Sequence, residues 1–217
     1  MTDNLDLFDT TAPAGPERLG PQSVVLRGFA LAAAGDLSRA IESIDRAAPF
    51  RHMLTPGGSA MSVAMTNCGA LGWITDRRGY RYGGIDPEHG VPWPPMPEAF
   101  LRLARDAAAA AGFADFTPDA CLINRYRPGA RMSLHQDRDE RDRSAPIVSV
   151  SLGMAATFLF GGAERADKVL RTPLQHGDVA VWGGVDRLRF HGVAPLADRP
   201  HPLLGHHRFN LTFRKAG

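Results

Sequence analysis

Lysine is scarce in this sequence of 217 residues, although basic residues are not. Of the 25 basic residues, only Lys168 and Lys215 are lysines, and all the others are arginines. A compositional bias of the genome is the simplest explanation of this excess. The formal net charge is only +2, which excludes a polycationic protein. Any contact with nucleic acid must therefore come from a local patch of arginines.

Cysteine and long apolar runs are also scarce. The two cysteines, Cys68 and Cys121, lie far apart, which argues against a disulfide scaffold and favours a reducing compartment. The longest uncharged stretch, residues 144–163, contains proline and several glycines, so it predicts two strands and a turn rather than a membrane span. The first residues are acidic and lack the basic region of a secretion signal. We expect a cytoplasmic protein that makes no contact with membranes.

The organisation of the chain indicates one domain after a short leader. Residues 1–21 are rich in proline, glycine and aspartate, and we expect a loose leader there. Residues 22–217 are expected to form a single domain, since 44% apolar and 22% charged residues are ordinary for a globular protein. Apolar spacing predicts a helix from Asp36 to about Ala48. A second helix is predicted to start at Pro97 and to end before Gly112.

Many short strand signals, separated by turn residues, occur along the rest of the chain. We predict strands at residues 24–26, 61–65, 121–126, 132–136, 147–152, 157–160, 169–174, 179–182, 189–191 and 207–214. Short strands at nearly even spacing are typical of a β-sandwich or jelly roll. The predicted fold is therefore mainly β with flanking helices, and residues 116–217 are predicted to form its jelly-roll core.

Residues 49–97 differ in character from the rest. They contain many glycines and prolines, two of the three tryptophans and two of the three tyrosines. A loop-rich aromatic segment of this length often covers a functional site. Arginines are interleaved there with Tyr80 and Tyr82, a combination that suits contact with phosphates and stacking on the bases of a single strand. A solvated hairpin tip would have the same composition.

His135 and Asp137 have the spacing of metal ligands. On a strand, residues i and i+2 face the same way, so both side chains can point at one ion. His191 follows a strand-like segment and is a candidate third ligand. Two histidines and one carboxylate form the facial triad of non-haem Fe(II) oxygenases, which leaves positions open for a co-substrate and O₂. A polar pair at the surface is the alternative for His135 and Asp137 alone. The histidines without such a carboxylate, which we exclude as ligands, are His52, His89, His176, His201, His206 and His207.

The predicted strand 207–214 separates apolar from polar side chains. Its two faces consist of Phe209, Leu211 and Phe213, and of Arg208, Asn210, Thr212 and Arg214. Two arginines beside an amide suit a small dicarboxylate, because each guanidinium can bind a carboxylate through two hydrogen bonds. On a second predicted strand, Leu122, Asn124 and Tyr126 share a face and would add an amide and a phenol. A solvated edge strand is the alternative for 207–214.

Several stretches of the sequence resemble the AlkB family of alkylated-DNA repair dioxygenases, which depend on Fe(II) and 2-oxoglutarate. The matching stretches are TPGG (55–58), MSVAMTNCG (61–69), LGW (71–73), PDACLINRY (118–126), SLHQD (133–137), APIVSVSLG (145–153), HGDVAVWGG (176–184) and NLTFR (210–214). Together they are highly specific and extend over nearly the whole chain. The leader and residues 163–169 match poorly, and Arg131 and Arg138 stand where lysines are expected, which leaves the fine substrate preference open.

The resemblance implies a double-stranded β-helix, or jelly-roll, core with an N-terminal nucleotide-recognition lid at residues 49–97. It implies that Fe(II) is held by His135, Asp137 and His191, which are also the catalytic residues. The residues implied for 2-oxoglutarate are Leu122, Asn124, Tyr126, Arg208, Asn210 and Arg214. The residues implied for the damaged nucleotide are Met65, Trp73, Tyr80, Arg81, Tyr82, Asp139 and Arg165.

The activity that the resemblance implies is oxidative demethylation of N-alkylated bases such as 1-methyladenine and 3-methylcytosine. Fe(II), 2-oxoglutarate and O₂ take part, and formaldehyde, succinate and CO₂ are released. The alkylated nitrogen is hidden in a duplex, so the base must be single-stranded or flipped out. The expected partner is single-stranded DNA, with RNA or a flipped base in duplex DNA as alternatives, and the protein is expected to be a monomer. Asp139 and the face of Trp73 would both favour a cationic base.

Two other functions are compatible with the same residues. An Fe(II)/2-oxoglutarate oxygenase of a protein or small-molecule substrate would share every metal and co-substrate residue, and the aromatic and arginine content of 49–97 argues against it. A non-catalytic nucleic-acid-binding jelly roll would explain that segment but would leave Arg208 and Arg214 without a purpose. Turnover of 2-oxoglutarate, with and without a methylated oligonucleotide, separates the three hypotheses.

Overall fold

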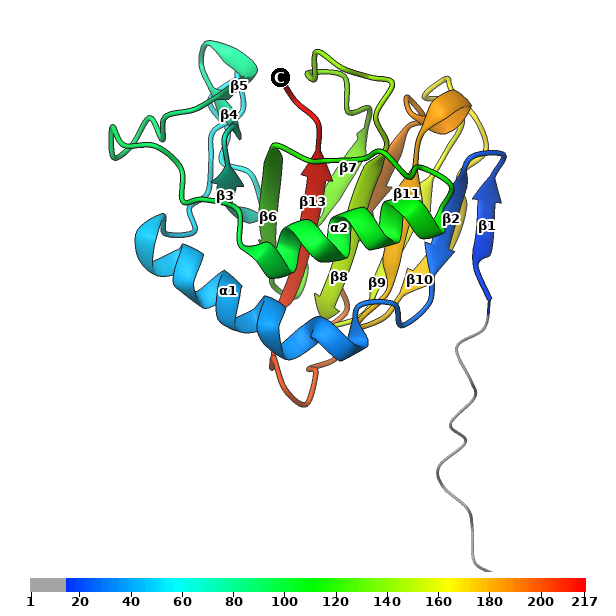
Figure 1. Ribbon diagram of the computed structural model, residues 1–217. Helices are drawn as coiled ribbons and strands as arrows, with labels where there is room; N and C mark the ends of the chain where they lie inside the picture. The colour runs from blue at the N-terminus through cyan, green and yellow to red at the C-terminus, as the bar shows by residue number, and fades with distance from the viewer. Residues whose placement is uncertain (1–14) are drawn as a thin grey trace, which may run out of the picture.

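The computed structural model describes residues 15–217, which form two β-sheets, a separate hairpin and two long helices (Figure 1). The larger sheet has seven strands in the order β1-β2-β11-β8-β13-β6-β3. Its strands are β1 (Glu17–Gly20), β2 (Ser23–Leu26), β3 (Ala64–Gly69), β6 (Ala120–Tyr126), β8 (Ile147–Gly153), β11 (Val179–Trp182) and β13 (Arg208–Arg214). Every neighbouring pair in this sheet is antiparallel.

The smaller sheet has four antiparallel strands in the order β10-β9-β12-β7. Its strands are β7 (Met132–His135), β9 (Ala156–Phe160), β10 (Leu170–Leu174) and β12 (His191–Val193). The hairpin consists of β4 (Gly72–Asp76) and β5 (Gly79–Gly83). Side chains from both sheets, including Phe158, Phe160 and Trp182, share one apolar cluster. The predicted jelly roll, mainly β with flanking helices, is confirmed.

Helices α1 (Ala34–Ala47) and α2 (Glu98–Ala110) lie across one face of the larger sheet (Figure 1). Their apolar sides pack with Leu211 and Phe213 of β13 in a single buried cluster. The helical residues of that cluster are Ala34, Leu37, Ile41, Ile44, Phe100, Leu103, Ala104, Ala107 and Ala108. Burial of one large apolar side chain contributes about 1.5–3 kcal/mol, so this layer fixes the sheet on the side opposite the smaller sheet.

The helix ends differ slightly from those predicted. A short 3₁₀ turn, η1 (Leu31–Ala33), leads into α1, so the helix begins two residues before Asp36. The carboxylate of Asp36 lies in the first turn, where it still interacts favourably with the helix dipole. Pro97 precedes α2 in an extended conformation, and Gly112 beyond its end has a φ of 92°, which glycine adopts most readily. No helix in residues 15–217 is long and apolar enough to span a membrane.

At three places the strands of the structure differ from the predicted boundaries. β1 lies within the leader predicted for residues 1–21 and pairs with β2. The expectation of a loose leader therefore fails at residues 17–20. Residues 1–14 lie outside the described part of the chain. β3 lies within the lid predicted for residues 49–97, yet it pairs with β6 and completes the larger sheet. β12 begins at His191, where the predicted strand 189–191 ends. The predicted strand 61–65 overlaps β3 only at Ala64 and Met65. Five of the six residues of β3 are buried, so the strand lacks the polar alternation that would have marked its bounds.

Leu211→Ala should lower the free energy of unfolding by about 2–5 kcal/mol, because this fully buried side chain lies in the cluster that joins β13 to the helices. Leu203→Ala is the matched control, since Leu203 is 80% exposed and its truncation should change the free energy by about 0.5 kcal/mol or less. Urea unfolding of both variants measures the difference. Equal losses would contradict this assignment of the core.

Candidate active site

His135 and His191 face each other across two neighbouring strands of the smaller sheet. Strands β7 and β12 are antiparallel, and their register places His135 directly opposite His191. The centroids of the two imidazole rings are 4.4 Å apart. Strand pairing therefore brings together two histidines that are distant in the sequence.

Asp137 completes the cluster from just beyond the end of β7. The predicted strand 132–136 ends at His135, so alternation along a strand does not place Asp137. Its carboxylate oxygens lie 3.6 Å from Nε2 of His135 and 3.7 Å from Nε2 of His191. One ligand atom from each of the three residues lies within 4.8 Å of the others, and no second group of three candidate ligands gathers in this way in residues 15–217.

Two buried arginines hold Asp137 in place. Nε and Nη2 of Arg214 donate to its Oδ2 at 2.9 and 2.7 Å, and Nη1 of Arg187 donates to its backbone carbonyl oxygen at 2.7 Å. Burial raises the pKa of the Asp137 carboxyl, but the charges of Arg214 and of the two histidines outweigh burial and hold this pKa well below its ordinary value. The carboxylate is therefore ionised at neutral pH.

Both histidines turn Nε2 toward Asp137. Nδ1–H of His135 donates to the carbonyl oxygen of Ser133 at 2.8 Å, and Nδ1–H of His191 donates to that of Arg189 at 3.0 Å. These bonds assign the ring proton to Nδ1 and leave the lone pair of Nε2 for a metal ion. Burial and then the charge of His135 lower the pKa of His191 to about 4, so the ring is neutral at pH 7, as a ligand must be.

A cavity between the sheets extends from these histidines toward Arg208. The residues that line it are Leu122, Asn124, Tyr126, Met132, His135, Ser149, Phe158, Trp182, His191, Gly192, Val193, Arg208, Asn210, Thr212 and Arg214. All four polar residues of β13 line it, and so do the three residues predicted to share one face of β6. The predicted alternation along these two strands is confirmed, because Leu211 and Phe213 lie in the opposite core cluster.

Arg208 is a buried cation that has no carboxylate partner in the described part of the chain. It is 1% exposed, and Nη2 donates to Oγ of Ser151 at 3.0 Å. Nε and Nη1 find no hydrogen-bond partner in residues 15–217, and neither does Oδ1 of Asn124. The ring of Tyr126 lies 4.9 Å from the guanidinium carbon. Buried polar groups are normally satisfied, so this end of the cavity is suited to a ligand carboxylate.

Asn210 and Arg214 are engaged by neighbouring groups instead. Nδ2 of Asn210 donates to Oγ of Ser149 at 2.8 Å and to the carbonyl oxygen of Val150 at 3.0 Å, while its Oδ1 accepts a hydrogen bond from Thr212. Arg214 is paired with Asp137. Asn210 and Arg214 therefore contribute no unsatisfied polar atom to the cavity, whereas Arg208 and Asn124 do.

Trp73 lies beside Asp139 next to the cavity. Nε1 of Trp73 donates to Oδ2 of Asp139 at 3.0 Å. Tyr80 stacks on Trp73 with ring centroids 5.5 Å apart, and it is 51% exposed. Trp73 also packs against the apolar cluster that contains Leu122 and Tyr126 of the cavity wall. An aromatic ring and a carboxylate are therefore held together behind one wall of the cavity.

Three other residues predicted for the nucleotide have different surroundings. Arg81 forms an ion pair with Asp76 at 2.7 Å inside the hairpin. Met65 is fully buried in β3. Arg165 is exposed, and its guanidinium lies 4.9 Å from the ring centroid of Phe190. Of these three, Arg165 is exposed and Arg81 is partly exposed, while Met65 contributes to the core.

Glu140 and Arg187 belong to the site and were missed by sequence reasoning. Glu140 accepts a hydrogen bond from the hydroxyl of Tyr82 at 2.7 Å and forms a buried ion pair with Arg187 at 3.1 Å. Glu140 stands in the charged run 137–143, a pattern typical of solvated surface. Arg187 ends a short 3₁₀ turn, directly after Asp186. Neither residue carries a local signal that would have identified it.

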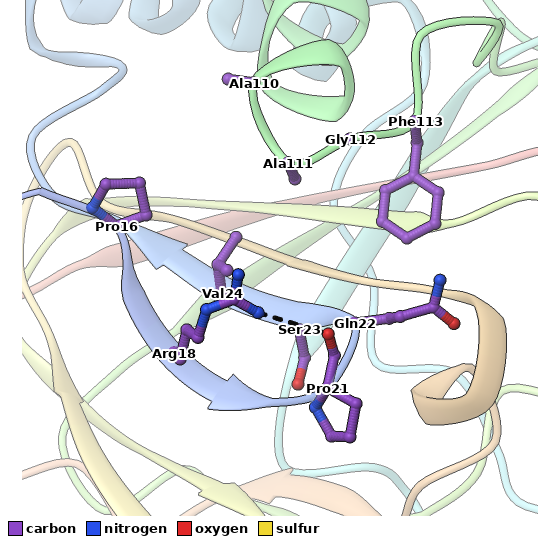
Figure 2. A pocket seen from close by; sticks show the side chains of 10 residues that line it. All are labelled: Pro16, Arg18, Pro21, Gln22, Ser23, Val24, Ala110, Ala111, Gly112 and Phe113. Carbon is purple, nitrogen blue, oxygen red and sulfur yellow. Dashed lines mark hydrogen bonds between the residues drawn. The ribbon is translucent and has the colours of Figure 1, made fainter.

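A second pocket, of about 490 Å³, lies between the β1–β2 hairpin and the end of α2 (Figure 2). Its lining residues are Pro16, Arg18, Pro21, Gln22, Ser23, Val24, Ala110, Ala111, Gly112 and Phe113. None of them lines the cavity that contains His135 and His191. No cluster of titratable side chains gathers there, so the chemistry belongs to the smaller, more deeply buried cavity.

The chain matches the model of the 2OG-Fe(II) oxygenase superfamily over residues 22–214. It is 58% identical to the alpha-ketoglutarate-dependent dioxygenase AlkB of Salmonella typhimurium over 212 residues and 57% identical to that of Escherichia coli over 213 residues, with 98% of each chain covered in both cases. Among solved structures, OsALKBH1 superimposes with a TM-score of 0.82 at 31% identity, over 93% of this chain and 100% of that one.

The fold and the His-Asp-His cluster define the class of the protein, a 2OG-Fe(II) oxygenase. Such enzymes require Fe(II), 2-oxoglutarate and O₂. Within this superfamily, the chain belongs to the AlkB family.

The described residues fit both groups that the family requires. Two imidazoles and one carboxylate, from β7, from the residues just after it and from β12, suit Fe(II) and leave positions open. The two unsatisfied nitrogens of Arg208 and the free Oδ1 of Asn124 suit a dicarboxylate at the far end of the cavity. 2-Oxoglutarate has a carboxylate at each end, and one cavity is lined both by the two histidines and by Arg208.

Arg208→Met should raise the dissociation constant of 2-oxoglutarate by roughly 30-fold or more, since loss of a buried charged partner costs about 2–5 kcal/mol. Arg208→Lys should restore part of the affinity, because a point charge cannot reproduce the guanidinium fork. Calorimetry with Mn(II) in place of Fe(II) measures binding without turnover.

Arg125→Met is the matched control. Arg125 is on the neighbouring strand β6, with its guanidinium over the ring of Phe50 and outside the cavity. Its removal should leave the affinity for 2-oxoglutarate unchanged. If Arg208→Met bound 2-oxoglutarate as tightly as the wild type, the assignment of Arg208 would be wrong.

Proposed function

We propose that this dioxygenase repairs nucleic acid by removing methyl groups from base nitrogens, with cationic lesions such as 1-methyladenine and 3-methylcytosine as substrates. The enzyme oxidatively demethylates alkylated nucleic acid, converts 2-oxoglutarate to succinate and CO₂, and releases formaldehyde. The AlkB relatives support this reaction. So does an Arabidopsis thaliana protein named DNA N(6)-methyladenine demethylase ALKBH1C, which is 35% identical over 67% of this chain.

The contact between Trp73 and Asp139 carries the proposal. It places the π-face of an indole beside an exposed carboxylate, two residues along the chain from Asp137. A cationic base is attracted to both groups, by the quadrupole of the ring and by the negative charge. A neutral metabolite would gain little from the carboxylate. The half-exposed ring of Tyr80, stacked on Trp73, extends this aromatic surface.

The roles of the chain in the reaction follow from the geometry. His135, Asp137 and His191 would hold Fe(II), and Arg208 with Asn124 would hold the distal carboxylate of 2-oxoglutarate. The bound metal, 2-oxoglutarate and O₂ together supply the oxidation that places a hydroxyl group on the methyl carbon. The resulting N-hydroxymethyl base then loses formaldehyde and regains its unmodified nitrogen.

The remaining residues of the site orient the reactants and keep water out. Arg214 and Arg187 fix the carboxylate and the backbone of Asp137, and would so orient this residue as a metal ligand. Phe158 and Trp182 form an apolar wall beside His191. Such a wall limits the access of water to the reacting centre.

We place the reaction on single-stranded DNA, or on a base flipped out of a duplex, because the methylated nitrogen is otherwise buried in base pairing. RNA offers the same chemistry. Residues 70–97, which follow β3 and include the hairpin β4–β5, would form the nucleotide-recognition lid. We further propose a cytoplasmic monomer; the free and buried Cys68 and Cys121 support a reducing compartment.

Trp73→Ala should reduce demethylation of a methylated single-stranded oligonucleotide by about 5- to 150-fold. The reason is that stacking of a base on an aromatic side chain contributes roughly 1–3 kcal/mol. The slow decay of 2-oxoglutarate without nucleic acid should persist, because Trp73 contacts neither histidine of the cluster. Formaldehyde and succinate are measured in parallel.

Trp73→Phe serves as the paired variant. It keeps an aromatic face but loses the hydrogen bond from Nε1 to Asp139. Its demethylation rate should lie between those of the wild type and Trp73→Ala. Wild-type demethylation by Trp73→Ala would refute a base-stacking role and return the substrate to the small-molecule or protein alternatives.

A further inference from the structure

A buried network of charges links the β4–β5 hairpin to Asp137. Glu140 and Arg187 are buried, with side chains 2% and 3% exposed. Neither residue lines the cavity, so neither is placed to touch 2-oxoglutarate there. Two charges are rarely taken out of water together unless further hydrogen bonds satisfy them, so the partners of Glu140 indicate its purpose.

Glu140 interacts with three groups that come from three parts of the chain. The hydroxyl of Tyr82 donates to its Oε1 at 2.7 Å, and Nε of Arg214 lies 3.3 Å from the same oxygen. Nη2 of Arg187 donates to its Oε2 at 3.1 Å. Both oxygens of the Glu140 carboxylate thus have partners within the protein, which makes Glu140 a structural group and not a ligand-binding one.

One end of this network reaches the proposed base-stacking surface. Tyr82 lies on β5 directly opposite Trp73 on β4, in the register of the hairpin. Burial raises the pKa of Tyr82 well above its ordinary value, so its hydroxyl keeps the proton that it donates to Glu140. The partner of Glu140 is therefore the cross-strand neighbour of Trp73.

The other end of the network reaches Asp137. Arg214 binds Oδ2 of Asp137 through Nε and Nη2, and the same Nε faces Glu140. Arg187 binds Glu140 through Nη2 and the backbone of Asp137 through Nη1. Both arginines therefore share one acidic partner, and both hold Asp137. Without Glu140, Arg187 would lose its carboxylate partner, and Arg214 would keep only the carboxylate of Asp137.

We propose that Glu140 is a positioning residue that couples the hairpin to the metal site, through Tyr82 on one side and Arg214 with Arg187 on the other. The proposal rests on the proposed function, because the coupling requires that a base binds at Trp73. A base seated on the hairpin tightens the contact of Tyr82 with Glu140 and so fixes Asp137. Without a base, the metal site is less well ordered, and 2-oxoglutarate is consumed without demethylation.

The first measurement needs no nucleic acid. Co(II), whose visible absorption reports its ligand geometry, is titrated into the metal-free wild type, Tyr82→Phe, Glu140→Gln and the double variant. Glu140→Gln should weaken Co(II) binding about 10-fold or more, as is usual when the partner that orients a ligand is lost, and should change the absorption spectrum. Tyr82→Phe should show a smaller change of the same kind. The double variant should be no weaker than Glu140→Gln alone, because both substitutions break one pathway.

The second measurement is the ratio of 2-oxoglutarate consumed to formaldehyde released on a methylated oligonucleotide. Tyr82→Phe should raise this ratio several-fold. Thr75→Val is the matched control: it removes another buried hydroxyl of the hairpin, one that donates to the carbonyl oxygen of Leu54 and lies outside the network. It should leave both the ratio and Co(II) binding at wild-type values, even if the protein becomes less stable.

Additive losses of Co(II) affinity in the double variant would overturn the proposal. It would also be overturned if Tyr82→Phe bound Co(II) like the wild type and kept the wild-type ratio of 2-oxoglutarate consumed to formaldehyde released. If Glu140→Gln fails to fold, Tyr82→Phe alone tests the proposal. This variant removes only the hydroxyl that donates to Glu140 and should therefore still fold. A wild type that demethylates no oligonucleotide refutes the proposed function, which the Co(II) titration does not test. The two failures are therefore distinguishable.

Discussion

The ion pair between Arg214 and Asp137 is the interaction on which the rest of the site depends. Asp137 stands beyond the end of β7, where no strand pairing holds it, so its position is set by the two bonds from Arg214 and by the backbone bond from Arg187. Breaking a buried ion pair by removing one partner typically costs 3–5 kcal/mol. Arg214 is fixed in turn by β13, the strand between β8 and β6 in the larger sheet.

β13 organises both halves of the chemistry. Its apolar face packs against the helices, and its polar face carries Arg208 at one end of the cavity and Arg214 at the other. Arg214 is satisfied within the protein, whereas Arg208 keeps two buried nitrogens without partners in residues 15–217. Arg214 therefore orients Asp137 in the metal site, whereas Arg208 is available to a ligand. The packing of the apolar face of β13 against the helices can offset the cost of burying Arg208 on its polar face without a full set of hydrogen bonds.

Periodicity predicted the parts of the site that lie on regular strands. The polar face of β13 and the face of β6 with Asn124 follow from alternation. The alternation of Ser149 and Ser151 on β8 could also have placed their hydroxyls beside Asn210 and Arg208. Sequence spacing could not show that His191 lies opposite His135, because register depends on the whole sheet. The resemblance to a family supplied that link, and with it the assignment of the hairpin residues.

Long-range partners of single residues could not be predicted. Asp137 was expected on a strand, yet its position comes from arginines 50 and 77 residues away in the sequence. Glu140 looked like part of a solvated charge run, and only the packing of Arg187 and Tyr82 around it shows that it is buried. The strand β3 was misplaced because burial on both of its faces removed the polar alternation.

The central claim is that His135, Asp137 and His191 bind one Fe(II) with positions left open for 2-oxoglutarate, whose far carboxylate reaches Arg208. An anaerobic titration tests it most directly, because a 2-oxo acid that chelates Fe(II) through its keto and carboxylate oxygens produces a visible charge-transfer absorption band. We expect the band to appear in the wild type only when both Fe(II) and 2-oxoglutarate are present, and to be absent in His191→Ala. A band of full intensity in His191→Ala would contradict the claim, and so would its absence from the wild type.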